Sequence, residues 1–284
     1  TAQTGTHYQT DHCGTHMPRR QLRSQSVTKA SGLASRFTRA DAPAKQRLVW
    51  AGYGEPGVGK TRFALGAPGP LVIQSCNRGL EGVVERFQKE KDIYVKEYEW
   101  APAPGAILEQ QAAIDLRDQF IADFEFAIGA ARTIIWDLES EVWDIFKYAE
   151  FGFSEQGVPK DWDALKARIR RLINMAKATD INFGMLQGMR NEWVPSINKK
   201  TGAKGITQSG RRIRAGMDEI EGLVHINLYH ERVKVPGEPS KFQFEVGKAR
   251  GPASEDVQDQ TFEGLDFKDF AMLVFSDSKE SDWV

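Results

Sequence analysis

The sequence reads Gly54-Glu55-Pro56-Gly57-Val58-Gly59-Lys60-Thr61 at the point that decides the fold, and this stretch matches the pattern G-x-x-x-x-G-K-[ST]. The apolar run at residues 47–53 precedes it and predicts a buried parallel strand. Residues 60–65 predict a short helix, which Gly66 and Pro68 end. A phosphate-binding loop requires this order of strand, loop and helix, so the stretch predicts an α/β fold.

The same eight residues predict a ligand. Glycines let backbone N–H groups curl around a chain of phosphates, because no Cβ stands in the way. Lys60 is expected to reach the β- and γ-phosphates as a catalytic residue, and the Thr61 hydroxyl to bind Mg²⁺. The loop therefore predicts ATP or GTP with Mg²⁺ as cofactors. The sequence has no readable base-recognition motif that would separate the two nucleotides.

Further strands and helices alternate after the loop. Strands are expected at 70–75, 93–98, 133–137 and 181–187, and helices at 108–128 and 162–176, the latter with Asp161 as its N-cap. This alternation predicts a mostly parallel sheet covered by helices on both faces. Late strands at 223–230 and 242–246, joined by a turn at 236–239, predict an antiparallel C-terminal extension.

Two acids follow the strand at 133–137. Asp137 ends this apolar strand, which suits a carboxylate that holds the hydration shell of Mg²⁺ beside the nucleotide. Glu139 lies two residues further on. It is expected either to orient water as a catalytic residue or to start the next helix, where acidic side chains are favourable.

The order of the loop, Asp137, a strand ending in Gln187 and the sequence Lys248-Ala249-Arg250 resembles a RecA-like P-loop ATPase core. More narrowly, the chain is similar to phage-encoded AAA-type nucleotide-binding proteins, among which are recombination ATPases that assist single-strand annealing. The resemblance spans residues 46–275. It is carried by the stretches 54–61, 134–140, 183–193 and 244–270.

The resemblance implies further catalytic roles. Gln187 would sense the γ-phosphate, and Lys248 and Arg250 would reach the nucleotide of a neighbouring subunit, where cations stabilise phosphate charge. The alternative for each is a solvated strand end. In the family, a glutamate after the second strand polarises the attacking water, but here residues 73–79 carry no carboxylate and Cys76 falls near that place. Either Glu139 or Glu81 takes this role, or hydrolysis is slow.

A basic segment at residues 188–216 is expected to be a mobile loop. It carries one acid, Glu192, one aromatic, Trp193, and the cations Arg190, Lys199, Lys200, Lys204, Arg211, Arg212 and Arg214. In RecA-like proteins the segment after this strand contacts DNA. The cations would neutralise phosphates and Trp193 would stack on a base, which predicts single-stranded DNA as a partner. The alternative is a solvated surface hairpin with its turn at 199–202.

The net charge of −1 hides an uneven distribution. Residues 1–40 carry six basic residues and one acid, so the remaining chain sums to −6. Residues 1–44 are polar and predict a flexible basic arm, and residues 45–284 a single ATPase core. Met17 is a plausible translational start. In this interpretation, residues 1–16 are a remnant of upstream sequence. Two cysteines cannot form a disulfide framework, which favours a reducing compartment and hence the cytoplasm, and no apolar run predicts a membrane span.

Three functions remain open. The leading one is an ATPase that acts on single-stranded DNA in recombination or repair, as a homo-oligomer and in the cytoplasm of a phage host, with a single-strand-binding or recombination protein as a further partner. The second is a nucleotide-gated assembly protein with little hydrolysis, which the missing carboxylate favours. The third is a P-loop small-molecule kinase, which lacks support because no compact Arg-rich lid is readable.

Overall fold

The computed structural model describes residues 46–76, 79–80, 82–99, 110–152, 159–197, 204–237, 239–251 and 254–283, and only the backbone of residues 159–161. These residues belong to one compact unit, Gln46–Val284. The predicted arm at residues 1–44 lies outside the described ranges, and so do Glu81, Lys199 and Lys200.

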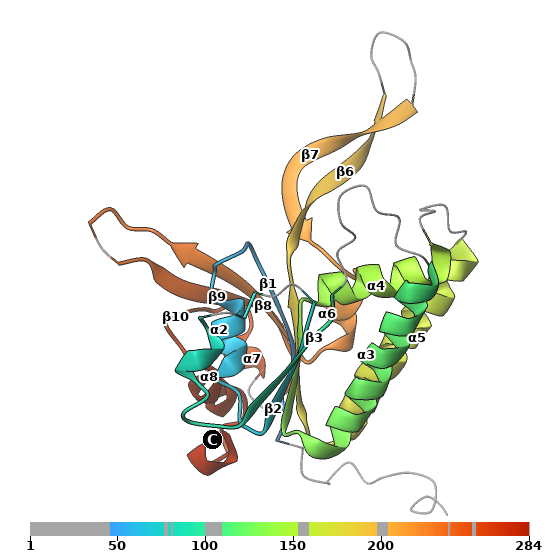
Figure 1. Ribbon diagram of the computed structural model, residues 1–284. Helices are drawn as coiled ribbons and strands as arrows, with labels where there is room; N and C mark the ends of the chain where they lie inside the picture. Colours follow the sequence, from blue (N-terminus) through green and yellow to red (C-terminus); the bar gives the residue numbers. More distant parts are fainter. Residues whose placement is uncertain are drawn as a thin grey trace, which may run out of the picture. The chain divides into compact units, whose positions relative to one another are not determined.

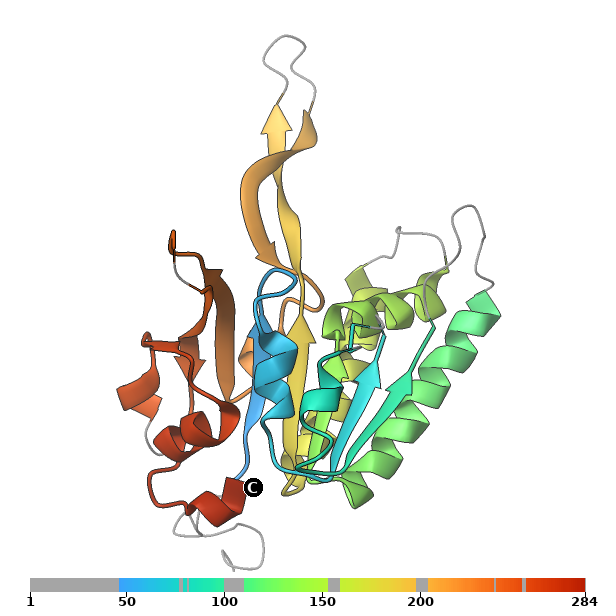
Figure 2. The same cartoon turned by 60° about the vertical axis from the view of Figure 1, so that its left-hand side comes forward.

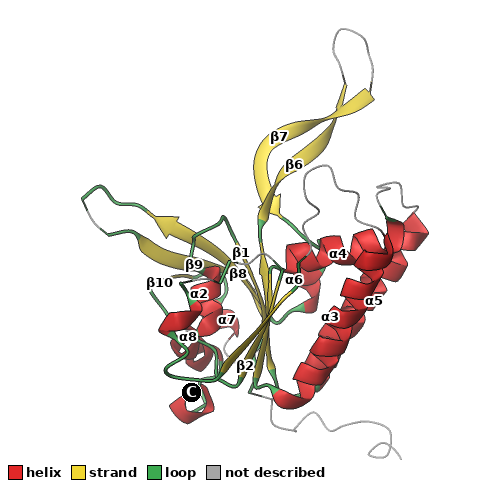
Figure 3. Ribbon diagram, in the orientation of Figure 1, coloured by secondary structure: helices red, strands yellow, loops and turns green. Residues whose placement is uncertain are grey.

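The main sheet is mostly parallel. Among the described residues, eight strands form it in the order β10-β9-β8-β1-β5-β4-β2-β3 (Figures 1 and 3). They are β1 (Val49–Tyr53), β2 (Leu71–Ser75), β3 (Ile93–Glu97), β4 (Thr133–Asp137), β5 (Asn182–Gln187), β8 (Ile226–Val233), β9 (Lys241–Ala249) and β10 (Thr261–Glu263). Neighbours from β8 to β3 pair in parallel, whereas β9 and β10 pair antiparallel. The predicted parallel sheet and its antiparallel extension are confirmed.

Helices cover both faces of this sheet (Figures 1 and 2). They are α2 (Lys60–Leu65), α3 (Gln110–Ala130), α4 (Glu139–Phe151), α5 (Pro159–Ala178), α6 (Ile220–Leu223), α7 (Ser254–Val257) and α8 (Phe267–Val274), with 3₁₀ turns η1 (Val84–Arg86) and η2 (Glu280–Trp283). On one face Phe124 of α3 packs on Trp136, and on the other Trp50 packs on Phe63 and Phe267. Burial on both faces explains why β1, β4 and β5 are continuous apolar runs. Of the described helices, none has the length and hydropathy needed to cross a membrane.

One helix start differs from the prediction. α5 begins at Pro159, so Asp161 lies inside its first turn and is not the N-cap. Proline is favoured at the first helical position, because the N–H that it lacks has no partner there and its φ already suits the helix.

The basic segment after β5 is a hairpin rather than the expected loop. β6 (Met189–Ile197) and β7 (Lys204–Arg214) pair antiparallel as a separate two-stranded sheet, with a bulge between Asn191 and Trp193. Figure 1 shows this ribbon projecting beyond the edge where the parallel strands end. β-Branched residues such as Val194 and Ile206 favour the extended conformation. The prediction of a loop rested on the glycines and charged residues of the segment. The segment thus has the form of a hairpin, and its binding to DNA stays a prediction.

Candidate nucleotide site and the adjoining hairpin

The phosphate loop connects β1 to α2 as the motif requires. Two of its glycines occupy positions that exclude a side chain. Gly54 has φ of 152°, and a Cβ there would lie 2.3 Å from the His230 carbonyl oxygen. Gly59 has φ of 96°, and a Cβ there would lie 3.0 Å from the Phe242 ring. The pattern of glycines is therefore needed both for the turn and for packing against β8 and β9.

Lys60 folds back over this loop. Its Nζ donates to the carbonyl oxygens of Gly54, at 2.8 Å, and Glu55, at 2.9 Å. The side chain is buried, and burial lowers the pKa of the ammonium, while the carboxylates of Asp137 and Glu55 oppose that shift. The cation is thus held within the loop, beside the backbone groups that would meet a phosphate.

Thr61 and Asp137 meet next to Lys60. The Thr61 Oγ1 donates to Asp137 Oδ2 at 3.0 Å, although the two residues come from α2 and from the end of β4. Burial raises the pKa of Asp137, and the Thr61 hydrogen bond and the Lys60 charge counteract it. Two adjacent oxygen ligands fit Mg²⁺, which commonly takes one or two carboxylates plus phosphates and water. The described residues contain no cluster of three or more His, Cys, Asp or Glu side chains that could hold a metal.

Gln187 ends β5, the strand between β1 and β4, and so lies at the same edge of the sheet. Its Nε2 donates to Glu139 Oε2 at 2.7 Å and to the Ala215 carbonyl oxygen at 3.1 Å. Ala215 immediately follows β7, and its N–H donates to the Gly188 carbonyl oxygen. The amide of Gln187 therefore joins the edge of the sheet to the base of the hairpin.

Glu139 is fully buried at the start of α4. Besides the Gln187 amide, it accepts a hydrogen bond from the Met217 N–H at 3.4 Å. Burial raises the pKa of this carboxyl to about 8, against the opposing effects of Gln187, Met217 and Arg214. Glu139 therefore holds a proton over most of the neutral range, and as it stands in this structure it is a buried connector and not a base facing solvent.

The position of the missing carboxylate is apolar. Cys76 follows β2, is buried, and donates its backbone N–H to the Asp137 carbonyl oxygen at 2.8 Å. Burial raises the pKa of its thiol, with the charges of Glu141 and Asp137 adding to the effect. Cys76 is thus a structural neighbour of Asp137 and not a substitute base.

Three hairpin cations that the sequence assigns to DNA form ion pairs at the base of the hairpin. Arg212 pairs with Glu55 at 3.2 Å, Arg214 with Glu221 at 2.8 Å, and Arg190 with Asp218 at 3.0 Å. Arg214 also lies over the Tyr53 ring, 5.1 Å from its centroid. Their charges are therefore partly neutralised, which a count of cations along the sequence does not show.

The rest of the described hairpin is open to solvent. Lys204 and Arg211 are exposed on β7, and Trp193 on β6 is 53% exposed. One face of the ribbon carries the side chains of Trp193, Ile197 and Ile206. Every second residue of a strand points to the same face, and Pro195, between Trp193 and Ile197 on that face, pairs with Ile206. Lys204, which pairs with Ile197, adds a cation to this apolar face.

Lys248 and Arg250 lie elsewhere. β9 runs antiparallel to β8 and pairs Lys248 with Asn227, the second residue of β8, which lies beside Ala51 in the middle of β1. The phosphate loop begins after the end of β1. The Lys248 ammonium donates to the carbonyl oxygens of Glu221 and Val224 at the end of α6. The structure does not bring these two cations to the loop of their own chain, and their role in a neighbouring subunit stays a prediction.

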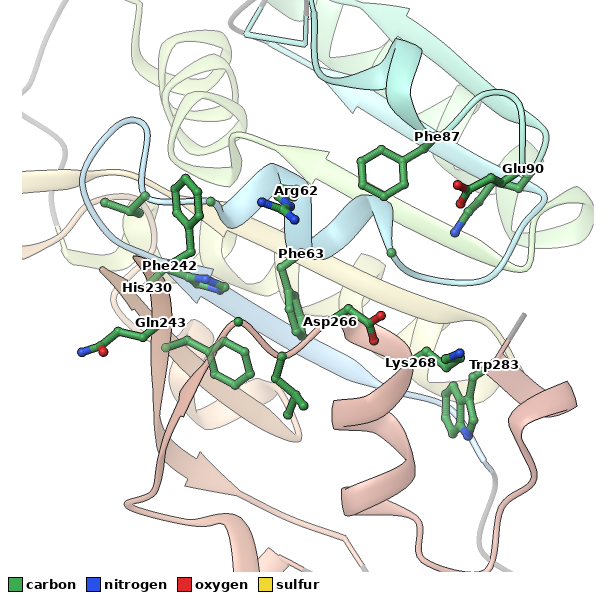
Figure 4. Close-up of a pocket in the computed structure, with 17 residues that line it drawn as sticks. Arg62, Phe63, Phe87, Glu90, His230, Phe242, Gln243, Asp266, Lys268 and Trp283 are labelled. Carbon is green, nitrogen blue, oxygen red and sulfur yellow. The ribbon is translucent and has the colours of Figure 1, made fainter. Parts of the chain in front are cut away.

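A cavity that the sequence analysis missed opens beside α2 (Figure 4). Val58 and Gly59 of the phosphate loop are part of its wall. The other walls come from the turn at Phe87 and from the segments at Phe242 and Asp266. These residues are far apart along the chain and follow no motif, so no signal in the sequence could have joined them.

The carboxyl edge of the sheet thus holds a buried lysine, a hydroxyl–carboxylate pair and an amide that reaches the hairpin. Such a set can bind a polyphosphate with a divalent cation. No family model and no curated protein matches this chain.

Proposed function

We propose that this chain is a P-loop ATPase of the RecA-like group that binds ATP with Mg²⁺ and acts on single-stranded DNA in recombination or repair. The observation that carries the proposal is the meeting of Lys60, Thr61 and Asp137 at one edge of the sheet, with Gln187 connecting that edge to a basic hairpin. The proposed setting is the cytoplasm, that of the host if the protein is phage-encoded.

The loop would hold the phosphates. Lys60 would exchange the carbonyl oxygens of Gly54 and Glu55 for phosphate oxygens, and the loop N–H groups would donate to the same chain. Thr61 and Asp137 would hold Mg²⁺, which when bound neutralises charge on the phosphate oxygens. The burial of Asp137 supports this assignment, because a cation would offset the cost of its charge.

The hairpin would hold the DNA. A γ-phosphate near Gln187 would compete for the amide that now binds Glu139 and Ala215, and Ala215 lies at the hairpin base. Nucleotide binding would thus shift the hairpin. Lys204 and Arg211 would contact phosphates and Trp193 would stack on a base.

The proposal includes a homo-oligomer, and the place of Lys248 and Arg250 supports it. Both lie away from the phosphate loop of their own chain, so in this proposal they serve the nucleotide of a neighbour. Arg250 is exposed and suits that role. A single-strand-binding or recombination protein would be a further partner.

Steady-state ATP hydrolysis tests the proposal, measured with and without an oligonucleotide on the wild type and on Lys60→Ala. We expect Mg²⁺-dependent hydrolysis that single-stranded DNA increases and that Lys60→Ala abolishes. Phosphoryl transfer to a nucleoside or nucleotide, with no response to DNA, would select a small-molecule kinase instead.

A second candidate is a nucleotide-gated assembly protein with little hydrolysis. The buried, protonated Glu139 favours it, because a carboxyl that is closed off from solvent and keeps its proton is a poor general base. Light scattering would then show a larger particle with ATP, while phosphate release stays at background.

A further inference from the structure

A cavity of about 410 Å³ lies along α2, next to the phosphate loop. This volume falls within the range of about 300–1,000 Å³ that is usual for small-molecule sites. Val58 and Gly59 belong both to the loop and to the cavity wall, so the cavity adjoins the place proposed for the phosphates. Figure 4 shows residues of α2 on one side and of β9 and α8 on the other.

The wall nearest the loop is aromatic. The Phe242 ring packs so closely on Gly59 that a Cβ at that glycine would lie 3.0 Å from the ring. The guanidinium of Arg62 lies 5.8 Å from the centroid of the same ring. A second guanidinium, that of Arg232, lies 5.5 Å from this centroid. A half-buried phenyl ring that holds planar cations can hold another planar ring in place of one of them, and nucleobases stack on such rings.

The wall further from the loop is charged. Glu90 and Asp266 line the cavity and are exposed to solvent, and Lys91 and Lys268 line it as well. One oxygen of Asp266, Oδ1, accepts the N–H of Asp269 as the N-cap of α8, so the carboxylate is held in place by the helix it caps. Carboxylate oxygens accept hydrogen bonds from amino groups, which both purine bases carry at their edges.

A buried histidine, His230 of β8, lies beside the cavity. His230 lines the cavity and is buried, and its Nε2 has no hydrogen-bond partner among the described residues. Burial and the Lys60 charge lower the pKa of this imidazole to about 3, so it is neutral and can serve as a donor or an acceptor. The Nε2 atom lies against Gly52 of β1, so the imidazole is part of the cavity wall and not a polar contact for a ligand.

We propose that this cavity is the nucleoside pocket of the site, in which a purine base takes the place of the Arg62 guanidinium on the Phe242 ring, with its amino edge toward Asp266. The inference rests on the proposed nucleotide binding at the phosphate loop. In this proposal the C-terminal segment from β9 to α8 is part of the ligand site. The pocket also identifies where the base would bind, which no motif in the sequence indicates.

Calorimetric titration with ATP, GTP and inorganic tripolyphosphate tests the pocket, because tripolyphosphate occupies the loop without a base. The wild type should bind one purine triphosphate more tightly than tripolyphosphate. Phe242→Ala should lower the affinity for that purine nucleotide by at least about fivefold, the loss expected for one stacking contact. The affinity for tripolyphosphate should not change. Phe126→Ala, which removes an exposed ring on α3, is the matched control and should bind like the wild type.

Phe242→Leu keeps apolar packing against Gly59 but has no ring, and it serves if the alanine variant does not fold. It should show the same loss for the nucleotide and the same affinity for tripolyphosphate. If ATP and GTP bind both variants as tightly as the wild type, the pocket is wrong while the phosphate site stands. If the wild type binds neither tripolyphosphate nor a nucleotide, the proposed function fails and the pocket fails with it.

Discussion

Arg212 of the hairpin forms an ion pair with Glu55 of the phosphate loop, with Nη2 of the first 3.2 Å from Oε2 of the second. The two residues are 157 positions apart in the sequence. Both side chains are about half exposed, so the pair contributes little to stability. Its importance lies in its place, because it connects the proposed nucleotide site to the proposed DNA site without passing through Gln187.

Glu55→Gln should therefore change the coupling between the proposed nucleotide and DNA sites more than it changes the free energy of unfolding. We expect a shift of less than about 0.5 kcal/mol in the free energy of unfolding, since an exposed pair is lost. The stimulation of ATP hydrolysis by single-stranded DNA should change, because Arg212 is released from the loop. Glu263→Gln removes a comparable exposed pair with Lys241 and should leave the stimulation unaltered. If single-stranded DNA stimulates ATP hydrolysis equally in Glu55→Gln and Glu263→Gln, the ion pair does not couple the two proposed sites.

Gly216→Ala should destabilise the chain strongly. Gly216 has φ of 85°, and a Cβ there would lie 2.1 Å from Glu139 Oε2. Gly237 has the same φ of 85° with nothing within 4 Å of the added Cβ, so Gly237→Ala carries the backbone strain alone. In urea unfolding we expect Gly237→Ala to cost about 1 kcal/mol and Gly216→Ala clearly more. Similar losses would show that the contact at Glu139 can relax.

The Glu139 carboxyl should make stability depend on pH. Its folded pKa of about 8 lies above its ordinary value of 4.5, so the folded state keeps a proton that the unfolded chain releases. This contribution is full below pH 4.5 and is lost as pH rises through 8, by up to about 1.4 kcal/mol per pH unit. Glu139→Gln cannot titrate, so unfolding between pH 5 and 8 should show the wild type losing stability relative to it. Parallel curves for the two proteins would contradict the raised pKa.

Lys60→Ala should abolish binding of ATP and of tripolyphosphate, because the cation at the loop is removed. Lys177→Ala is a matched control, since its Nζ also donates to a backbone carbonyl oxygen, that of Leu223 at 2.9 Å, away from the loop. Calorimetry should show wild-type affinity for the control. Retained ATP affinity in Lys60→Ala would argue against a phosphate site at this loop.

Trp193→Ala should weaken binding of single-stranded oligonucleotides. Stacking of one base is worth about 1–3 kcal/mol, which corresponds to a loss of at least about fivefold in affinity. Fluorescence anisotropy at low salt is the measurement, because phosphate contacts are strongest there. The exposed ring of Phe126 provides the comparison, and Phe126→Ala should bind normally. If the wild type itself fails to bind at low salt, the hairpin is not a DNA site.

Local patterns in the sequence were enough to predict the phosphate loop and the ends of the strands around it. β4 ends at Asp137 and β5 at Gln187, as the apolar runs closed by a polar residue indicate. Helix α2 covers residues 60–65 as predicted. These features could be predicted because each depends on residues that are neighbours along the chain, where burial on both faces of a parallel strand leaves a continuous apolar signal.

The contacts of the candidate side chains depend on how distant segments of the chain fold together. The sequence counts the cations of residues 188–216, but it does not show that Arg212 meets Glu55 or that Arg190 meets Asp218. It contains Glu139 as a candidate base, while the packing of α4 against Met217 buries that carboxyl. Such contacts join segments far apart in the sequence, and strand order and register place them. Neighbouring residues therefore predict the strand, loop and helix around residues 54–61, whereas strand order and register leave only some of the hairpin cations open to solvent.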